Sequence, residues 1–370
     1  MTEPGRRLEA PHRRAAATTT PRLVERLVER LVERAAVLAY RATSWLLRVV
    51  PAGIARVVIG LGAQASYFAW PAKRRWSNAN FGHVLGLPPD DRRVRALALR
   101  AYREYGRYLV DLMRLPTLPP AAVGNLVANI DEKEAEIRRI WGDAPGGGLI
   151  MTVGHIGSNE AIAAGAARIG LPISVVADDT AFPELYEILR RQRAAWGFTL
   201  IPWRNLRGIF GVLRRREMLG LLIDWGYRSD GIPVRLFDAW TTLPAGPATL
   251  AAKTGSTILP ISIHRQADGT YALSWEPPIN VVSTDPAELQ RASQAMADAL
   301  AASIAAAPHQ WYSFKPLWPE GDAEAADLER RARLMQAGQP DPGPGRGLPR
   351  DEADQVAAEP AGVDAVDVPA

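Results

Sequence analysis

The stretch that most constrains the fold is GGGLIMTVGHIGSNEAIAAG, at residues 146–165. Its apolar run, Leu149 to Val153, is short and bounded by glycines, which is typical of a strand buried on both faces of a sheet. The alanine-rich segment from Glu160 favours a helix, and the serine and asparagine directly before it can cap its start. The stretch therefore predicts a strand, a tight turn that contains His155, and a helix.

His155 and Glu160 are the chemically interesting pair of this stretch. On one continuous helix their separation of five residues would place them about 140° apart, too far around to touch. With His155 in the turn, its ring can lie over the first helical turn and meet the Glu160 carboxylate, which also gains from the positive end of the helix. A neutral imidazole held by a carboxylate can act as a general base for a hydroxyl group. The spacing alone fits a capping Glu beside an incidental His equally well.

The pattern after Gly146 predicts an α/β fold. Short apolar runs alternate with helical segments, which favours a mainly parallel central sheet flanked by helices. The predicted strands are Leu149 to Val153, Pro172 to Ala177, Thr199 to Pro202, Leu219 to Ile223, Ser256 to Ile263 and Tyr271 to Glu276. The predicted helices are Phe182 to Trp196, Leu206 to Arg216, Pro247 to Lys253 and Asp285 to Ala306.

Composition excludes several kinds of chemistry. The chain of 370 residues has no cysteine, which rules out disulfides, thiolate nucleophiles and Cys-ligated metals. A nucleophile must therefore be a hydroxyl, a carboxylate or the substrate itself. Apolar residues make up 47% and charged residues 23%, so a sizeable core is available. The length fits two domains or one larger α/β domain with a helical extension.

The N-terminal region is basic and amphipathic. Residues 1–110 carry twenty Lys and Arg against eight Asp and Glu, so this part of the protein faces something negative. The tetrapeptide repeat LVERLVERLVER, Leu23 to Arg34, places its leucines on one stripe of a helix. The repeat is equally well explained as the extension of a surface helix without a specific function.

The segment Tyr40 to Trp76 indicates a membrane surface. It is apolar and aromatic, is interrupted by arginines, and ends in a basic cluster at residues 73–75. Its longest uncharged run, Val57 to Ala72, is shorter than the ~20 residues that a membrane-spanning helix needs. Aromatic residues suit the headgroup level, and basic residues suit anionic lipid. We therefore expect this segment to lie on an anionic membrane surface. The alternative is an ordinary pair of core helices with a basic exposed face.

These patterns divide the chain into four parts. They are a disordered basic segment at 1–21, an amphipathic helical membrane-associating region at 22–120, an α/β core at 121–319, and a charged helix with a disordered acidic tail at 320–370, unfolded from Ala337. The first part lacks the apolar core of a secretory signal.

Polar side chains follow the predicted strands at one edge of the sheet. They are His155, the pair Asp178 and Asp179, Asp224 and His264, joined by Arg193 at a helix end and Arg204 after another strand. Ligands of such sheets bind beyond the carboxyl ends of the strands. Because Arg grips phosphate bidentately, this set suits an acceptor hydroxyl on a molecule that bears phosphate. Gly246 starts a further helix, whose free N–H groups could receive an anion.

Seven motifs in order carry a resemblance to a known family. They are YRATSWLLRVVP, SNANFGHVLG, AYREYGRYLVDLMRLP, GHIGSNE, LRGIFGVLRRREMLGLLIDWGYRSDGIPVRLFD, LPAGPATLAAKTGSTILPISIH and PHQWYSFKPLWP. From about Tyr40 to Trp318 the chain resembles the bacterial lysophospholipid acyltransferase superfamily. Within it, the similarity is to the branch that holds the late, lauroyl- and myristoyl-transferring enzymes of lipid A biosynthesis and the phosphatidylinositol mannoside acyltransferases.

The resemblance implies a function and a site. His155 and Glu160 match the family's His-x4-Asp/Glu motif, with His155 as the base and Glu160 orienting it. Arg193 and Asp224 fall where the family places other functionally important charges. Members transfer a fatty acyl chain from acyl carrier protein or coenzyme A to a hydroxyl of a lipid or glycolipid at the cytoplasmic face of the plasma membrane. Two departures affect the acceptor pocket: IGSN inside the motif, and LFDAW where relatives tend to have FFG followed by an acid.

We therefore expect a peripheral or monotopic acyltransferase with catalytic His155 and Glu160. The expected substrate-binding residues are Arg193, Asp224, Arg204 and Gly246. We expect no metal, no cofactor besides the acyl-thioester co-substrate, and no nucleic-acid partner. Two alternatives stay open. One is a metal-dependent glycosyltransferase that uses Asp178 and Asp179, and the other is a non-catalytic lipid-binding protein.

Overall fold

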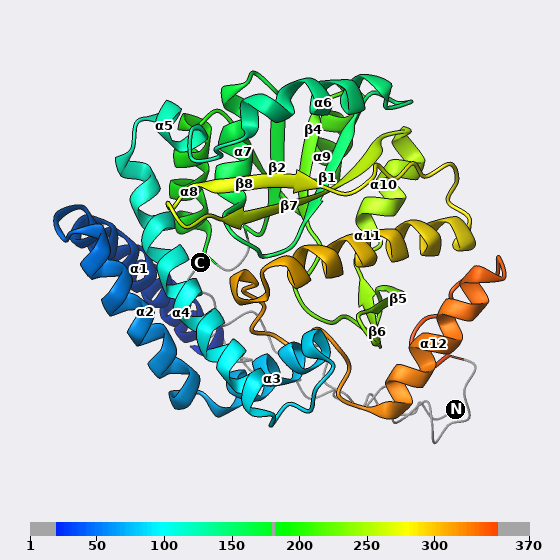
Figure 1. Cartoon of the computed structure of the whole chain (residues 1–370), viewed down its shortest axis with the longest axis horizontal. Coiled ribbons are helices and arrows are strands. Elements are labelled where there is room, and N and C mark those ends of the chain that lie inside the picture. Colours follow the sequence, from blue (N-terminus) through cyan, green and yellow to red (C-terminus); the bar gives the residue numbers. More distant parts are fainter. Residues whose placement is uncertain (1–19, 180–181, 347–370) are drawn as a thin grey trace, which may run out of the picture.

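The computed structural model describes residues 20–179 and 182–346, and a six-stranded sheet lies at its centre (Figure 1). Its strands, in spatial order, are β3 (Thr199–Pro202), β2 (Ile173–Ala177), β4 (Met218–Leu222), β1 (Leu149–Val153), β7 (Thr257–Arg265) and β8 (Tyr271–Trp275). Neighbouring strands are parallel except β7 and β8, which are antiparallel. This confirms the predicted α/β class with a mainly parallel sheet.

Strand β1 is central because both of its faces are apolar and covered. All five of its residues are buried. Ile150 belongs to one apolar cluster with α9 (Leu206–Arg214), α10 (Gly246–Thr254) and α11 (Pro286–Ala306). Its neighbours Leu149 and Met151 belong to a second cluster with α6 (Ile130–Asp143) and α7 (Asn159–Arg168). Alternate side chains of one strand therefore anchor helices on opposite faces of the sheet. The helix α8 (Pro183–Ala195) packs beside the edge strand β3.

A separate hairpin, which the sequence did not predict, follows β4. Its strands β5 (Ile232–Leu236) and β6 (Ala239–Leu243) form a two-stranded antiparallel sheet. Two features hide it in the sequence. Pro233 interrupts the strand pattern, and the turn at Phe237 and Asp238 lacks the glycine or asparagine that marks tight hairpins. Phe237 takes a positive φ of 53° there.

Four helices form the N-terminal region. They are α1 (Thr20–Val49), α2 (Ala52–Ala69), α3 (Pro71–Leu85) and α4 (Arg92–Arg114), and prolines separate the first three. Helix α2 packs closely on α4, since a Cβ added at Gly106 would lie 2.8 Å from the Gly60 Cα. The Arg56 guanidinium pairs with Asp111 at 2.8 Å. This region therefore packs against the α/β core through α4, and α1 reaches α8 as well.

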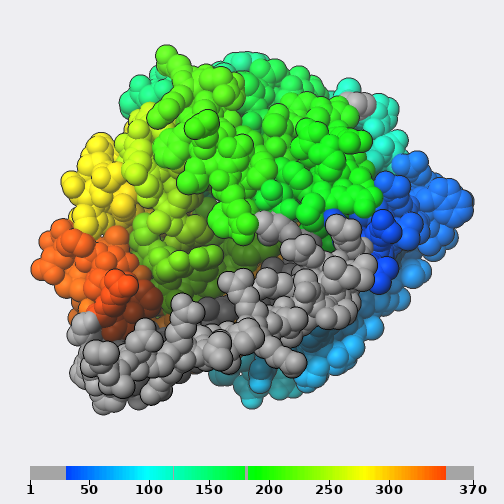
Figure 2. Space-filling view, turned by 180° about the vertical axis from the view of Figure 1, so that it is seen from behind, coloured from blue at the N-terminus to red at the C-terminus, as the bar shows by residue number. Residues whose placement is uncertain are grey.

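The outer faces of α1 and α2 are apolar. Figure 2 shows α1 (blue) beside the green part of the chain that includes α8. The exposed large apolar side chains of these two helices, among the described ones, are Leu31, Val32, Leu38, Trp45, Leu46, Val49, Ile54, Val57, Val58, Leu61 and Phe68. By length and composition α2 could cross a membrane, and only 17% of it is buried in the protein. Such a contiguous apolar face on a protein surface is typical of an interaction site.

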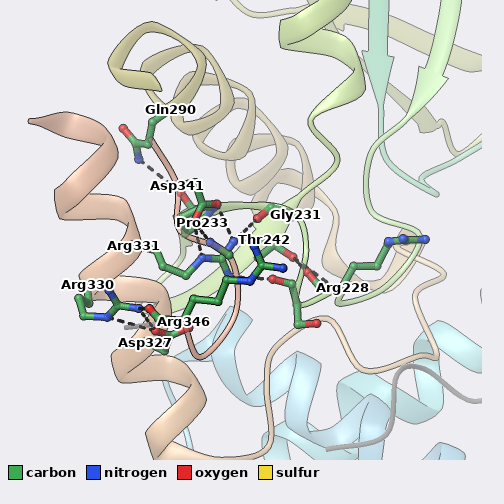
Figure 3. Close-up of polar contacts among 12 residues, drawn as sticks. Arg228, Gly231, Pro233, Thr242, Gln290, Asp327, Arg330, Arg331, Asp341 and Arg346 are labelled. Atoms are coloured by element: carbon green, nitrogen blue, oxygen red, sulfur yellow. Dashed lines mark hydrogen bonds and ion pairs between the residues drawn. The ribbon is translucent and has the colours of Figure 1, made fainter. Parts of the chain in front are cut away.

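The C-terminal part fastens the β5–β6 hairpin. Helix α12 (Asp322–Gln336) carries Arg331, which is 1% exposed and donates to the carbonyls of Ser229 and Gly231 at 2.7 and 2.9 Å (Figure 3). The same guanidinium binds the Asp341 carboxylate at 2.7 Å. Asp341 and Gly345 therefore contact the folded protein, in a stretch that was predicted to be unfolded from Ala337. The predictions for residues 1–19 and 347–370 lie outside the described residues.

Short elements complete the fold. A 3₁₀ turn (Leu115–Thr117) and α5 (Pro120–Gly124) link α4 to α6. A second 3₁₀ turn (Pro308–Gln310) follows α11 and leads into an aromatic segment, residues 311–318. The backbone N–H of Tyr312 donates to the His155 carbonyl at 2.8 Å, so this segment reaches the edge of the sheet where the site residues were expected.

Candidate active site

The His155 side chain lies at the carboxyl end of β1 and binds Asp224. The imidazole Nδ1 is 2.6 Å from Asp224 Oδ1, and the His155 backbone N–H donates to both carboxylate oxygens, at 3.1 and 2.9 Å. Asp224 follows β4, which pairs with β1 in parallel. Because parallel strands end at the same edge of the sheet, two residues far apart in the sequence meet there.

Asp224 is buried and fully engaged. Its carboxylate also accepts a hydrogen bond from Trp311 Nε1 at 2.8 Å, and the residue is 1% exposed. Burial alone would raise the pKa of Asp224, but the charge of His155 and the hydrogen bonds from His155 and Trp311 outweigh burial and lower the pKa. Asp224 is therefore ionised at neutral pH. It accepts the Nδ1–H of His155, which leaves Nε2 of the neutral ring as a proton acceptor.

Glu160 has different partners from the predicted one. Its carboxylate binds Arg193 Nη2 at 3.0 Å and accepts from the Tyr108 hydroxyl at 3.3 Å. The structure therefore corrects the predicted pairing, since Asp224 and not Glu160 holds the His155 ring. The His155 backbone N–H and ring both bind the Asp224 carboxylate. The buried Arg193 guanidinium needs a carboxylate as its countercharge, and Glu160 provides it.

The predicted turn and helix cap are present. Ser158 is the N-cap of α7, and its hydroxyl accepts from the Ala161 N–H at 3.4 Å. Gly157 takes a positive φ of 62°, and a Cβ there would lie 2.4 Å from the Ile263 carbonyl oxygen. Glycine is therefore required at this position of the turn. Glu160 lies in the first turn of α7, where the helix dipole favours its charge.

Among the described residues, no hydrogen bond joins the other predicted substrate-binding residues to His155. Arg193 is 7% exposed, and one nitrogen of its guanidinium is bonded to Glu160. Arg204 is exposed and stacks on Trp203 at 5.0 Å. Gly246 begins α10 on the surface, and among the described residues no hydrogen bond joins it to His155 or Asp224.

Aromatic residues around His155 escaped the sequence analysis. The Trp225 ring lies 5.5 Å from the His155 ring, and half of the Trp225 residue is exposed. Tyr312 stacks on Tyr108 at 5.2 Å. Burial and the Glu160 charge raise the pKa of Tyr108, so its hydroxyl stays a donor. The aromatic sequence WYSF at residues 311–314 was the available signal, but it names no partner in the sheet.

The comparisons with known proteins decide the family. The model of the bacterial lipid A biosynthesis acyltransferases matches residues 25–320. The chain belongs to this family. It is 30% identical over 306 residues to the phosphatidylinositol mannoside acyltransferase of Mycolicibacterium smegmatis, a match that covers 80% of this chain and 94% of the relative. The enzyme of that name from Mycobacterium tuberculosis is 27% identical over 307 residues, which cover 80% of this chain and 92% of the relative.

Membership in this acyltransferase family bears on the alternatives. It confirms the resemblance seen in the sequence and gives no support to a glycosyltransferase that uses Asp178 and Asp179. Both residues follow β2. Within residues 20–179 and 182–346, no group of three or more His, Asp or Glu side chains is arranged to hold a metal ion. At the sheet edge, the His155 imidazole has its Nδ1 bonded to Asp224, and its Nε2 can accept a proton.

Proposed function

We propose that this acyltransferase moves a fatty acyl chain from an acyl thioester, on acyl carrier protein or coenzyme A, to a hydroxyl of a glycolipid or lysophospholipid. The observation that carries the proposal is the pair His155 and Asp224, a partly exposed imidazole on a buried, ionised carboxylate. The family supports acyl transfer, and its relatives that act on phosphatidylinositol mannosides support an acceptor of that kind.

The proposed reaction is a direct transfer. Nε2 of His155 takes the proton of the acceptor hydroxyl as its oxygen attacks the thioester carbonyl carbon. The new C–O bond forms, the C–S bond breaks, and the leaving thiolate receives the proton from the imidazolium. A thiol of ordinary pKa, about 8.5, is a competent leaving group under these conditions. Asp224 stabilises the imidazolium, whose side-chain exposure of 26% leaves room for contact with a substrate.

Glu160 takes a positioning role in this mechanism. Its bonds to Arg193 and Tyr108 fix the first turn of α7 and hence the turn that carries His155. The family's His-x4-Glu spacing then reflects two roles, a base and a residue that holds the base's turn in place. Backbone N–H groups at the start of α7 or of α10 at Gly246 are the candidates for stabilising the oxyanion.

We place the reaction at the cytoplasmic face of the bacterial plasma membrane. The exposed apolar faces of α1 and α2 and the basic residues near Lys73 suit an anionic bilayer surface. Arg56 lies within α2 and is paired with Asp111, which favours α2 lying on the membrane over crossing it. A lipid acceptor can then reach His155 without leaving the bilayer entirely.

Turnover of a labelled acyl donor tests this function. The purified protein is incubated with acyl-carrier protein or acyl-coenzyme A and with lipids extracted from the source cells, and products are identified by mass spectrometry. We expect an acylated glycolipid and no acyl-protein in the absence of acceptor. Binding of lipid without any turnover would favour the non-catalytic alternative. A stable acyl-protein adduct that the acceptor discharges would replace direct transfer by a two-step mechanism.

Liposome sedimentation tests the location. The wild type should sediment with anionic liposomes, less so at high salt, because apolar burial persists when charge is screened. Changing Trp45 and Phe68 to Ser, which are 64% and 60% exposed on α1 and α2, should weaken sedimentation. Val282→Ser changes an 85% exposed side chain away from α1 and α2 and serves as the control. A wild type that stays in solution at low salt would remove the membrane assignment.

A further inference from the structure

A lysine lies over the tryptophan ring that neighbours the proposed catalytic imidazole. The Lys315 ammonium is 4.2 Å from the centroid of the Trp225 ring, and that ring is 5.5 Å from the ring of His155. The Lys315 stem runs along Gly226, since a Cβ added at this glycine would lie 3.7 Å from Lys315 Cβ and 3.9 Å from its Cδ. Trp225 and Gly226 directly follow Asp224, so Lys315 packs on the loop that holds the imidazole's partner.

The backbone around Lys315 is held from two sides. The buried Asn80 side chain of α3 donates to the carbonyls of Ser313 and Lys315, at 3.1 and 2.7 Å. From the opposite side, the Tyr227 N–H donates to the Pro316 carbonyl at 2.8 Å. The lysine stem is therefore anchored, and its ammonium is kept near the rim of the site. This is the arrangement of a binding group and not of a mobile surface lysine.

The charge of Lys315 is not matched by a carboxylate. Among the described residues, no carboxylate lies within ion-pair distance of its ammonium, whose neighbour is the Trp225 ring. Burial lowers the pKa of Lys315, and the like charge of Lys73 lowers it further, while Asp178 acts in the opposite direction. The Lys73 ammonium lies over Trp70 at 4.2 Å.

Two largely buried arginines of this region are already paired with carboxylates. Arg193 is bonded to Glu160 at 3.0 Å, and Arg265 is paired with Asp111 at 2.6 Å. Arg193 was predicted to bind a substrate phosphate, and Lys315 is a second candidate for that role because no described carboxylate forms an ion pair with it. Lys315 suits this role because it is anchored, partly exposed and lies over the ring that neighbours His155. A lysine binds phosphate as a point charge and needs no bidentate geometry.

We propose that Lys315, lying on Trp225, binds a phosphate ester of a substrate next to His155. The proposal rests on the proposed function and adds the chemical class that the site recognises. The phosphate can belong to the phosphodiester of a phospholipid acceptor or to the phosphopantetheine or coenzyme A of the donor. Both present an anion to the same ammonium, so the experiment has to separate them.

Direct binding provides the first test. The indole N–H signal of Trp225, assigned with Trp225→Phe, is followed by NMR during titration of the full-length protein. The probes are short-chain phosphatidylinositol, coenzyme A and phosphate-free pantetheine. We expect at least one phosphate-bearing probe to shift the signal. Lys315→Met keeps the stem and removes the charge, and should weaken binding of that probe about tenfold or more, as expected for a charge-assisted contact. The probe whose binding is weakened by Lys315→Met identifies the source of the phosphate.

A matched pair in the same protein provides the control. Lys133 lies over Trp275 at 4.8 Å, outside the proposed site, so Lys133→Met should leave the Trp225 titrations unchanged. In turnover assays, Lys315→Met should raise KM for the phosphate-bearing substrate about tenfold with kcat nearly unchanged. Lys315→Arg should restore most of the affinity, because it keeps the charge.

Two results would overturn the assignment. The first is that phosphate-bearing probes shift no Trp225 signal in the wild type, or bind wild type and Lys315→Met equally well. The second is that Lys315→Met loses as much affinity for phosphate-free pantetheine as for the phosphate-bearing probes, which would make Lys315 a packing residue. The titrations do not depend on catalysis. A wild type that binds the phosphate probes but transfers no acyl chain would contradict the proposed function, whereas phosphate binding at Lys315 would still stand.

Discussion

The two carboxylates near His155 have the same chemistry and opposite surroundings. Asp224 is buried, but its partner ring is 26% exposed on the side chain, so a proton taken by the ring can come from a substrate. Glu160 binds Arg193, whose side chain is 8% exposed, and the Tyr108 hydroxyl. The first pair opens towards solvent through its base, whereas the second is largely closed, with the Arg193 and Glu160 side chains 8% and 15% exposed.

This difference assigns Asp224 to the reaction and Glu160 to holding the structure of the site. A carboxylate that can stabilise a newly formed imidazolium contributes to the transition state. A carboxylate locked to a permanent cation contributes the same interaction before and after proton transfer, so it lowers no barrier directly. Glu160 fixes geometry, and its loss should mainly lower stability. The two roles can be distinguished by the relative effects of substitutions on the reaction rate and on the free energy of unfolding.

The largest effect is expected for His155→Ala. Removal of a positioned general base should lower the rate of acyl transfer by about two to four orders of magnitude. The melting temperature should fall only moderately, because Asp224 loses the ring but keeps its hydrogen bonds from the residue 155 backbone N–H and from Trp311. Steady-state rates and circular dichroism melting curves measure both quantities. A variant that folds and keeps the wild-type rate would contradict the proposed mechanism.

Asp224→Asn should come next. The amide keeps the shape but no longer fixes the tautomer or stabilises the imidazolium, so we expect a rate loss of about two orders of magnitude. The pKa of Asp224 is lowered by folding, so the ionised carboxylate adds stability above its ordinary pKa of 3.8, and this is lost as pH falls through the lower folded value. Urea unfolding should therefore show the largest difference from wild type near neutral pH.

The pH dependence provides the check on Asp224. Below its ordinary pKa of 3.8, the difference in unfolding free energy between wild type and Asp224→Asn should shrink. A difference that stays constant down to the folded pKa and beyond would mean that the ionised state contributes nothing. Equal rates for wild type and variant at neutral pH would place the imidazole's partner elsewhere.

Glu160→Gln should reverse the balance between rate and stability. It leaves the buried Arg193 guanidinium without a countercharge, and breaking such a pair costs roughly 3–5 kcal/mol of unfolding free energy. The rate of the folded fraction should fall less than in Asp224→Asn. Glu160→Gln combined with Arg193→Met should recover part of the lost stability, because no uncompensated charge remains.

A surface carboxylate is the matched control for Glu160. Glu187 on α8 also pairs with arginines, Arg190 and Arg191, but at the surface, where the Glu187 side chain is 39% exposed. Glu187→Gln should leave both stability and rate near wild type. If Glu160→Gln lowers the rate as strongly as Asp224→Asn while remaining stable, Glu160 takes part in the proton transfer and the distinction between the two carboxylates fails.

The sequence predicted the elements better than their contacts. Strands such as Leu149–Val153 and helices such as Pro286–Ala306 were predicted to within a few residues, because apolar periodicity is a local signal. The His155 and Asp224 pair depends on β1 and β4 becoming neighbours, which no local pattern specifies. Glu160 attracted the assignment because it is close in the sequence. The sequence placed Asp224 at the same sheet edge as His155, and the resemblance marked it as functionally important, but neither identified it as the partner of His155.

The same limit explains the other omissions. The hairpin after β4 carries a proline and a turn without glycine, so its strand signal was masked, and tertiary packing under Arg331 stabilises it instead. Lys315 and Trp225 are 90 residues apart in the chain and come into contact where their loops pack together. Side chains that meet through loops leave no periodic trace in a single sequence.

The smallest expected effect belongs to Tyr108→Phe, which tests the closed side of the comparison alone. The change removes the hydroxyl that donates to Glu160 at 3.3 Å and keeps the ring stacked on Tyr312. Glu160 retains Arg193, so the loss should be about 0.5–1.5 kcal/mol of unfolding free energy. Because burial raises the pKa of Tyr108, the hydroxyl is protonated across the neutral range and the loss should not vary with pH.

Tyr312→Phe is the control for this last change. Its ring belongs to the same cluster, and among the described residues its hydroxyl has no hydrogen-bond partner, so its removal should cost less than that of Tyr108. Neither variant should change the rate of acyl transfer more than about twofold, because neither hydroxyl faces the imidazole's partner. A rate loss in Tyr108→Phe as large as that in Asp224→Asn, with stability intact, would show that the Glu160 side communicates with the reacting atoms. The two carboxylates would then form one catalytic network instead of a base with its separate support.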